Sequence, residues 1–364
     1  MPELVSLRGA IGLGVFAFAL TMASTAASGQ DAPRDARDQK LFRFEFDNDT
    51  FVGSDDVFTA GWSVQVHSPL LDEWPPGLEG WIGRLPGLHD DDEGGRVARW
   101  AWGITQIILT PKDITIAEPQ LDDAPWAGML GGYASWSAYD NRRLAAAQVY
   151  LGCIGPCSRA EEAQKLIHNS LGFGDSPEGW DHQLDDRLLL NVNYEYRRKL
   201  WMGDTTYDTR AWGSDLSVGA QAGLGNFATY AQVWLEYRFG WGVPQGFTKF
   251  ADPPAVGIAL DPVYADPVAE QVPRRTWRPY FNVVARLRSL GEFAPTDGGD
   301  TRSGGSHPRV DDPPGDEQLI VGVHVAKLPL AFHLTYHRYF DGEDLAAATG
   351  AELDWINFSF ERRF

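Results

Sequence analysis

The chain has 364 residues, of which 43% are hydrophobic and 12% aromatic, and its formal net charge is −19. Outside one stretch near the N-terminus it lacks the apolar runs of about 20 residues that a helical membrane protein needs. The negative charge argues against a nucleic-acid partner, because phosphates would be repelled. The aromatic content suits the girdles of a membrane barrel, although a Trp-rich β-sandwich would match it as well.

The N-terminal 29 residues predict a secretory signal peptide. Arg8 precedes an apolar run over residues 10–27, and small residues follow, so we expect cleavage near Ala27 or Gly29. The alternative is an N-terminal anchor helix, against which the small residues and the strand signals further on both argue. We expect residues 30–40 to be a short linker and residues 41–364 to form a single β-barrel domain.

The first strand signal after the linker sets the pattern for the rest of the chain. Phe42, Phe44 and Phe46 alternate with Arg43, Glu45 and Asp47, which gives one oily face and one polar face. Similar segments recur throughout, and their even number is typical of single-chain bacterial barrels. We therefore predict an all-β fold, an antiparallel transmembrane β-barrel of the outer-membrane type with about twelve strands: 41–48, 60–67, 99–110, 131–139, 143–151, 188–197, 209–221, 229–239, 277–288, 317–325, 330–339 and 353–364.

The polar faces of these strands are expected to line the barrel interior. Charges such as Glu236 and Arg238 would be costly against lipid, whereas a polar lumen tolerates them. In an up-and-down barrel the first, third and fifth loops (49–59, 111–130 and 152–187) open at the same end. The long even-numbered connections 68–98 and 240–276 do not fit short periplasmic turns, so they are expected to fold into plugs or short helices, unless the strand count is off.

The fifth loop holds the one clear helix signal. Ser158 with Glu161 three residues later predicts a capping box, and Gln164 and His168 project from the same side of the helix. Cys153 and Cys157 precede it, and an oxidising periplasm permits a disulfide between them but does not require one. A zinc site is not expected, since no pair of histidines accompanies the two cysteines.

Several segments, taken in order and spacing, resemble the outer-membrane lipid A deacylase family of the lipopolysaccharide 3′-O-deacylase type. They are Asn48-Asp49, Phe58-Thr59-Ala60-Gly61, residues 109–114, residues 122–128 and residues 155–183. The resemblance implies a barrel in the bacterial outer membrane that removes an acyl chain from lipopolysaccharide. It also implies calcium dependence, and it places the family's catalytic histidine at His168.

His168 suits the role of a general base on water, because the unperturbed pKa of histidine lies near neutrality. On its position alone, a surface or capping histidine would be the simpler interpretation. The family has a carboxylate after this histidine, for which Asp175 is the best counterpart here and Glu178 the alternative. No Gly-x-Ser-x-Gly elbow is present, which favours attack by water over an acyl-enzyme.

The other candidate site residues are Asn48, Asp49 and Thr59. Ester hydrolysis needs positive charge for the developing oxyanion, and calcium takes oxygen ligands of the kinds found here. We expect Asp49 and Asp175 to hold the metal, and Asn48 and Thr59 to complete the ligand and oxyanion shell. A simple turn at Asn48 and Asp49 is the alternative, since both residue types favour turns.

The sequence therefore predicts a calcium-dependent lipid A deacylase, expected to be a monomer, with lipopolysaccharide as substrate. Two competing functions remain at this point. One is a calcium-dependent outer-membrane phospholipase with a serine nucleophile, and the other is a channel or structural barrel without chemistry.

Overall fold

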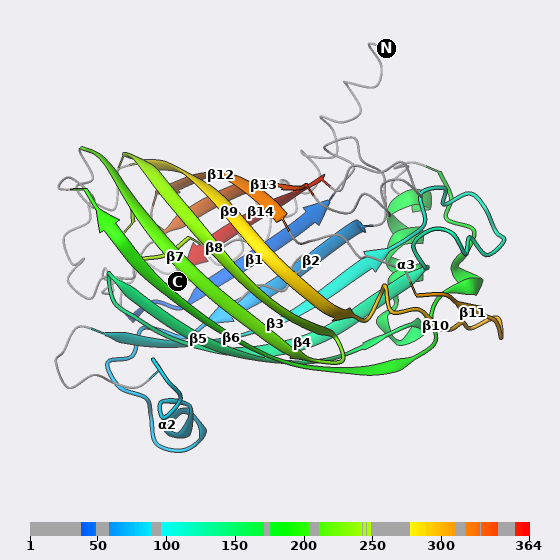
Figure 1. The fold of residues 1–364 in the computed structure, drawn as a ribbon, viewed down its shortest axis with the longest axis horizontal. Helices are drawn as coiled ribbons and strands as arrows, with labels where there is room; N and C mark the ends of the chain where they lie inside the picture. Colours follow the sequence, from blue (N-terminus) through cyan, green and yellow to red (C-terminus); the bar gives the residue numbers. More distant parts are fainter. Residues whose placement is uncertain are drawn as a thin grey trace, which may run out of the picture.

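The computed structural model describes residues 38–48, 58–88, 96–170, 175–203, 211–241, 243–244, 246–248, 277–309, 317–327, 329–340 and 354–364. Within them, twelve antiparallel strands close into a barrel (Figure 1). The predicted signal peptide and linker lie almost wholly outside the described residues. The barrel strands are β1 (Leu41–Asn48), β2 (Phe58–His67), β3 (Val97–Leu109), β4 (Ala127–Tyr139), β5 (Arg143–Ile154), β6 (Arg187–Met202), β7 (Trp212–Gly225), β8 (Ala228–Trp241), β9 (Arg278–Phe293), β12 (Glu317–Lys327), β13 (Leu330–Tyr339) and β14 (Asp354–Arg363).

Closure is made by the first and last strands. The register of β1 against β14 runs from Leu41 opposite Arg363 to Asn48 opposite Ile356. A closed sheet leaves no unpaired edge, which is the condition for strands to span lipid. The twelve predicted strands are confirmed, although several extend further; β4 begins at Ala127 instead of residue 131.

Several strands were predicted too short, because small residues interrupt the alternation of polar and apolar residues near their ends. A two-residue hairpin, β10 (Gly299–Asp300) with β11 (Ser306–His307), was not predicted, because a pair this short has no measurable alternation.

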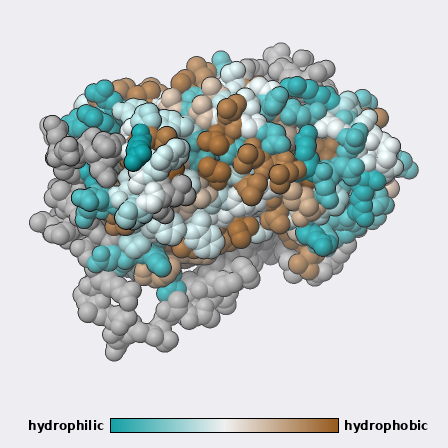
Figure 2. All heavy atoms as spheres, turned by 90° about the horizontal axis from the view of Figure 1, so that it is seen from below, coloured by the Kyte–Doolittle hydropathy of each residue, from teal (hydrophilic) through white to brown (hydrophobic). Residues whose placement is uncertain are grey.

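Alternation places the polar rows inside the barrel and the apolar rows outside. On β6, Asn191, Asn193 and Glu195 are buried, whereas Leu190 and Val192 are each 51% exposed. None of the helices in the described part of the chain is long and apolar enough to cross a membrane. Viewed from below, the molecule carries hydrophobic residues mainly across its middle, with hydrophilic residues towards both ends (Figure 2).

Buried ion pairs fill the lumen. Arg43 donates from Nε to Glu361 (2.7 Å), and Asp215 accepts from Arg238 Nε (2.9 Å) and lies 3.1 Å from Lys199 Nζ. These side chains are 4% exposed or less. Charges in a low-dielectric interior persist only when they are paired in this way. The prediction of a polar barrel interior is confirmed.

The barrel has two distinct ends. The connections after β1, β3 and β5 leave at one of them, here called the site end, as strand parity predicts. The other, called the terminal end, brings together the start of β1 and the end of β14, where Lys40 and Phe364 exchange backbone hydrogen bonds of 3.1 Å. The 242–277 connection also leaves at the terminal end, but most of it lies outside the described residues.

The 69–88 segment between β2 and β3, called here the outer strap, lies on the outside of the barrel wall and does not plug the lumen (Figure 1). It includes the short helix α2 (Leu78–Ile82) and begins by pairing Leu71 with Ala98 of β3. Its apolar residues Trp74, Ile82 and Leu88 pack on outward-facing alanines of β3, β4 and β5: Ala98, Ala138, Ala145 and Ala147.

These small wall residues make room for the strap. Gly87, at φ 70°, lies so close to Ala145 that a Cβ there would be 2.8 Å from the alanine methyl. Both the positive φ and the close approach therefore require glycine. The expectation that this long connection contains a short helix is confirmed, and the alternative of a plug is wrong for the described residues.

Candidate active site

The segment between β5 and β6 folds back over the outer face of the wall at the site end. It begins with the 3-10 turn Pro156–Ser158, continues as helix α3 (Ala160–Lys165) and ends in the π-helical turn Leu166–Ser170. The Cys153–Cys157 disulfide closes a short loop just before α3. This arrangement sets the candidate site on the lipid-facing side of the barrel, at its rim.

A chain of hydrogen bonds attaches the start of this segment to the wall. The Trp62 indole Nε1 donates to Gln106 Oε1 (2.8 Å), and Gln106 Nε2 donates to the Ser158 carbonyl (2.7 Å). Trp62 and Gln106 both belong to the outward rows of their strands, β2 and β3. The helical segment is therefore held against the outside of the barrel by polar contacts that lipid could not provide.

Apolar packing continues this attachment. Ile108, Trp126, Ala160 and Trp180 form one buried cluster, in which the rings of the two tryptophans are 5.1 Å apart. Gly128 on β4 is essential to the fit, because a Cβ there would overlap Ala160 Cβ and Ser158 Oγ. Helix α3 can approach β4 this closely only over a glycine.

The beginning of α3 differs from the predicted capping box. Arg159, in the left-handed conformation at φ 57°, is the N-cap, and no side chain caps the helix. Ser158 instead donates its hydroxyl to the Gly155 carbonyl (2.6 Å), within the preceding turn. The hydrogen bond from Arg159 to Glu162 lowers the pKa of that carboxyl. The prediction failed because the short 3-10 turn uses Ser158 before the α-helix begins.

His168 lies in the π-helical turn and is half-buried. Its Nδ1 is 2.8 Å from the backbone carbonyl oxygen of Asp175. A carbonyl can only accept, so Nδ1 carries the proton and, in the neutral ring, Nε2 has the free lone pair. The structure thus brings His168 and Asp175 together, but through the backbone of Asp175; the carboxylate belongs to an exposed residue.

Gln164, predicted to project with His168, is buried and fixed. Its Oε1 accepts a hydrogen bond from Trp180 Nε1 at 2.7 Å. The turn that carries Asp175 is tied to the neighbouring loop, since the Glu178 amide donates to the Ile114 carbonyl (2.9 Å). In that same loop Thr115 donates two hydrogen bonds to Asp113, which lower the pKa of its carboxyl. The histidine is therefore positioned by two loops that pack on each other.

Asn48 is the last residue of β1 and follows Phe42, Phe44 and Phe46 in the outward row, on the same wall face as α3. It pairs with Ala60, which in turn pairs with Ile108 beneath α3. At a strand spacing of about 4.8 Å, the backbones of Asn48 and Ile108 are roughly 10 Å apart. Asn48 and the histidine-bearing segment thus share one end and one face of the barrel.

Thr59 occupies a β-bulge. Phe58 pairs with Leu109 and Ala60 with Ile108, so Thr59 is the extra residue in the ladder between β2 and β3. Bulges next to active sites commonly re-aim a side chain. Asp49 and the rest of the first loop up to residue 57 lie outside the described residues, so the predicted role of Asp49 stays a prediction.

In the part of the chain that the structure describes, no three His, Cys, Asp or Glu side chains gather into a metal-binding group. The predicted calcium ligands Asp49 and Asp175 come from two separate loops, of which only the second is described. The donor types at hand, a carboxylate and the Asn48 amide, fit a hard cation such as calcium.

Sequence reasoning missed the residues that hold the site together, among them Gln106. The outward row of β3 runs Trp102, Ile104, Gln106, Ile108. A polar residue in such a row signals that another part of the chain covers it, because lipid would leave its amide unpaired. Lys112, exposed and three residues beyond β3, is a positively charged side chain at this end of the barrel and was not among the predicted site residues.

The fold and the site together define a bacterial outer-membrane β-barrel with a polar, histidine-containing site on the outer side of its rim. A family model described as outer membrane protein LpxR matches residues 14–364. The chain therefore belongs to the LpxR outer membrane protein family, and the outer-membrane location is established with it.

Comparison with solved structures supports the same architecture. LpxR from Salmonella typhimurium has a TM-score of 0.65 at 15% identity, covering 89% of this chain and 100% of that one. The β domain of the Bordetella autotransporter BrkA follows with a TM-score of 0.41 at 9% identity, covering 90% and 99%. Comparison with curated protein sequences gives no match. At 15% identity, the LpxR structure supports the fold alone.

Proposed function

We propose that this protein is a lipid A deacylase that hydrolyses an acyl ester of lipopolysaccharide at the outer side of its rim. The main observation in favour is the setting of His168, whose proton position is fixed by a carbonyl on the lipid-facing side of the wall. The residues just before it, Leu166 and Ile167, are 61% and 39% exposed. A base beside exposed apolar side chains at the membrane boundary suits a substrate that is itself a lipid.

In this proposal His168 Nε2 takes a proton from a water molecule, which attacks the ester carbonyl. The Asp175 carbonyl keeps Nδ1 protonated and stabilises the imidazolium that forms, as a hydrogen-bond acceptor does in other histidine bases. Water attack needs no serine nucleophile. Ser158 lies near this segment, but it is buried and its hydroxyl is engaged by Gly155.

Asn48 and Thr59 would complete the shell around the ester from the wall side, and Asp49 and Asp175 would hold a calcium ion. When bound, calcium would supply positive charge for the oxyanion that develops during hydrolysis. The bulge at Thr59 lies on β2, next to β3, against which the helical segment packs, and Asn48 lies one strand further on, at the end of β1. This placement supports a substrate lying between the wall and α3.

The test is mass spectrometry of lipid A from cells that produce either the wild type or His168→Ala. Loss of one acyl chain with the wild type alone is the expected result, and identical spectra would overturn the proposal. With purified protein, a chelator should stop the reaction and calcium should restore it. Activity that persists in the presence of the chelator would rule out the calcium ion, but it would not contradict the role of His168 as the general base.

The filled lumen argues against the competing channel function. Side chains such as Arg43, Glu236 and Arg238 are at most 1% exposed, which leaves no open water path around them. We expect planar bilayers containing the protein to show no steady single-channel conductance. Steady conductance together with unchanged lipid A would favour the channel instead. Labelling by a serine-reactive fluorophosphonate would favour the phospholipase.

A further inference from the structure

The outward face of strands β7, β8 and β9 differs between its two halves. Near the terminal end it carries packed aromatic rings; Trp212 and Trp241 are 4.6 Å apart, and Phe239 and Phe281 are 5.5 Å apart. Towards the site end the aromatic rings give way to a mixture of small residues and exposed aliphatic ones. The small residues include Ala222, Ala231 and Ser289, and the aliphatic ones are Leu224, Val233 and Leu287.

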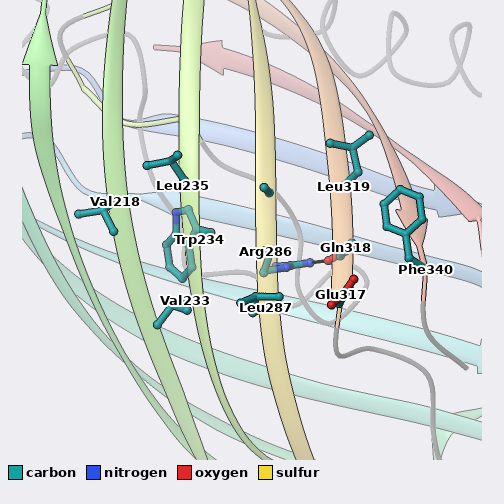
Figure 3. A pocket seen from close by; sticks show the side chains of 11 residues that line it. Val218, Val233, Trp234, Leu235, Arg286, Leu287, Glu317, Gln318, Leu319 and Phe340 are labelled. Atoms are coloured by element: carbon teal, nitrogen blue, oxygen red, sulfur yellow. Dashed lines mark hydrogen bonds between the residues drawn. The ribbon is translucent and has the colours of Figure 1, made fainter.

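A depression of about 500 Å³ lies where the small residues begin. Figure 3 shows its side chains coming from neighbouring strands, with Val233 and Leu235 on β8, Leu287 on β9 and Phe340 just beyond β13. Trp234 and Arg286, which belong to the inward rows, close it on the lumen side, and Arg286 is hydrogen-bonded to Gln318. Its volume lies within the range of ligand pockets, about 300–1,000 Å³. The cavity is mainly apolar, with the exposed carboxylate of Glu317 in its lining, and it is open to the outside of the wall.

The register shows how deep this depression lies. Leu287 pairs with Val233 on one side and with Glu317, the first residue of β12, on the other. Phe340 follows the last residue of β13, also at the site end. The cavity thus lies in the half of the wall nearer the site end.

A positively charged side chain lies beside the cavity. Arg338, in the outward row of β13, has its guanidinium 6.0 Å from the Phe340 ring centroid. Its side chain is 42% exposed while it pairs with Asp354 at 3.7 Å. A mainly apolar cavity next to an accessible guanidinium suits a ligand that has a hydrocarbon chain and an anionic head group.

We propose that this cavity binds one acyl chain of a phosphorylated glycolipid of the outer leaflet, with a phosphate of the head near Arg338. β1 begins and β14 ends at the terminal end, which we assign to the periplasmic side because the chain is inserted from there, so the cavity opens to the outer leaflet. The outer leaflet of this membrane is built of such glycolipids, whose phosphates a guanidinium binds well.

This lipid site is separate from the candidate active site. In the closed strand order, β8 lies halfway around the ring from β2, with five strands between them in either direction. The glycolipid bound here would therefore be a second molecule, not the one being hydrolysed. The proposal depends on the outer-membrane location and not on catalysis.

The experiment is native mass spectrometry of the delipidated protein after incubation with purified lipid A or with phosphatidylglycerol. We expect the wild type to keep one lipid A molecule and Ala285→Trp, which fills the cavity, to lose it by about tenfold, equivalent to about 1.4 kcal/mol. Val323→Trp is the matched control; it adds the same ring to an outward position of β12 outside the cavity.

Val233→Trp, which fills the cavity from β8, serves as the second variant if Ala285→Trp does not fold. Arg338→Gln should weaken the binding of bisphosphorylated lipid A and leave that of the dephosphorylated form unchanged. If the wild type, Ala285→Trp and Val233→Trp retained equal amounts of lipid A, the proposed binding site would be wrong. If the wild type retained phosphatidylglycerol as well as it retains lipid A, the proposed choice of ligand would be wrong. His168→Ala should keep the bound lipid, so a failure of the deacylase proposal would leave this result standing.

Discussion

At the scale of single residues, Asp175 has two functional groups with different expected roles. Its backbone carbonyl accepts the hydrogen bond from His168, and substitution of the side chain leaves that carbonyl in place. The carboxylate is the proposed calcium ligand. The two roles can therefore be separated by one substitution.

We predict that Asp175→Asn raises the calcium concentration needed for half-maximal activity by about 10–100-fold. The rate at saturating calcium should stay close to that of the wild type, because His168 keeps its orientation. Calcium titration of purified protein measures both quantities. Glu178→Gln, an exposed carboxylate on the same turn, is the control. If Glu178→Gln shifts the titration and Asp175→Asn does not, the ligand assignment is reversed.

At the scale of elements, the contact between β4 and α3 determines where His168 lies. A methyl at position 128 would overlap α3, whereas one at Gly132, in the same outward row, would meet only the Gly103 carbonyl oxygen at 3.5 Å. We predict that Gly128→Ala lowers deacylation by about 100-fold, as expected for a catalytic group misplaced by about 1 Å. Gly132→Ala should retain activity.

Both variants should remain folded barrels, which the mobility shift between unheated and heated samples in gel electrophoresis tests. Equal activity of Gly128→Ala and Gly132→Ala would contradict the role given to this contact.

The outer strap depends on a similar close approach at the opposite end of the wall. Ala145→Leu should push Gly87 away and release the strap, so that trypsin cleaves at the exposed Arg84 faster than in the wild type. Val149→Leu, further along the same outward row and 39% exposed, should not change the cleavage rate. Unchanged cleavage in Ala145→Leu would mean that other contacts hold the strap.

The elements differ in how far the sequence predicts them. Strands such as β6 and β8 follow directly from alternation, because each side chain faces either lipid or the lumen. Contacts between the barrel wall and the segments that cover its outer face are harder to predict from the sequence. They show only as a polar residue in an apolar outward row, such as Gln106, or as a run of outward-facing alanines. The tautomer of His168 could not be predicted, because it depends on a backbone carbonyl seven residues away that only the folded turn brings close.

At the scale of the whole molecule, buried charges pair with one another inside the barrel. Asp215 accepts from Arg238 and pairs with Lys199, and all three are 3% exposed or less. We predict that Asp215→Asn lowers the free energy of unfolding by about 3–5 kcal/mol, because two buried cations lose their carboxylate. Urea unfolding in detergent measures the change.

Glu292→Gln removes the same charge from an exposed position on β9 and should change stability by no more than about 0.5 kcal/mol. A similar loss in both variants would mean that overall charge matters more than the buried network.

Ring closure has a consequence for the timing of the proposed activity in the cell. Asn48 ends β1, and one edge of that strand is bonded only to β14, the C-terminal strand of the barrel. Until the C-terminal strand has joined, the wall that carries Asn48 has no fixed partner on that side. A nascent or exported chain would therefore stay inert towards lipids it meets on its way, and would become competent only on arrival.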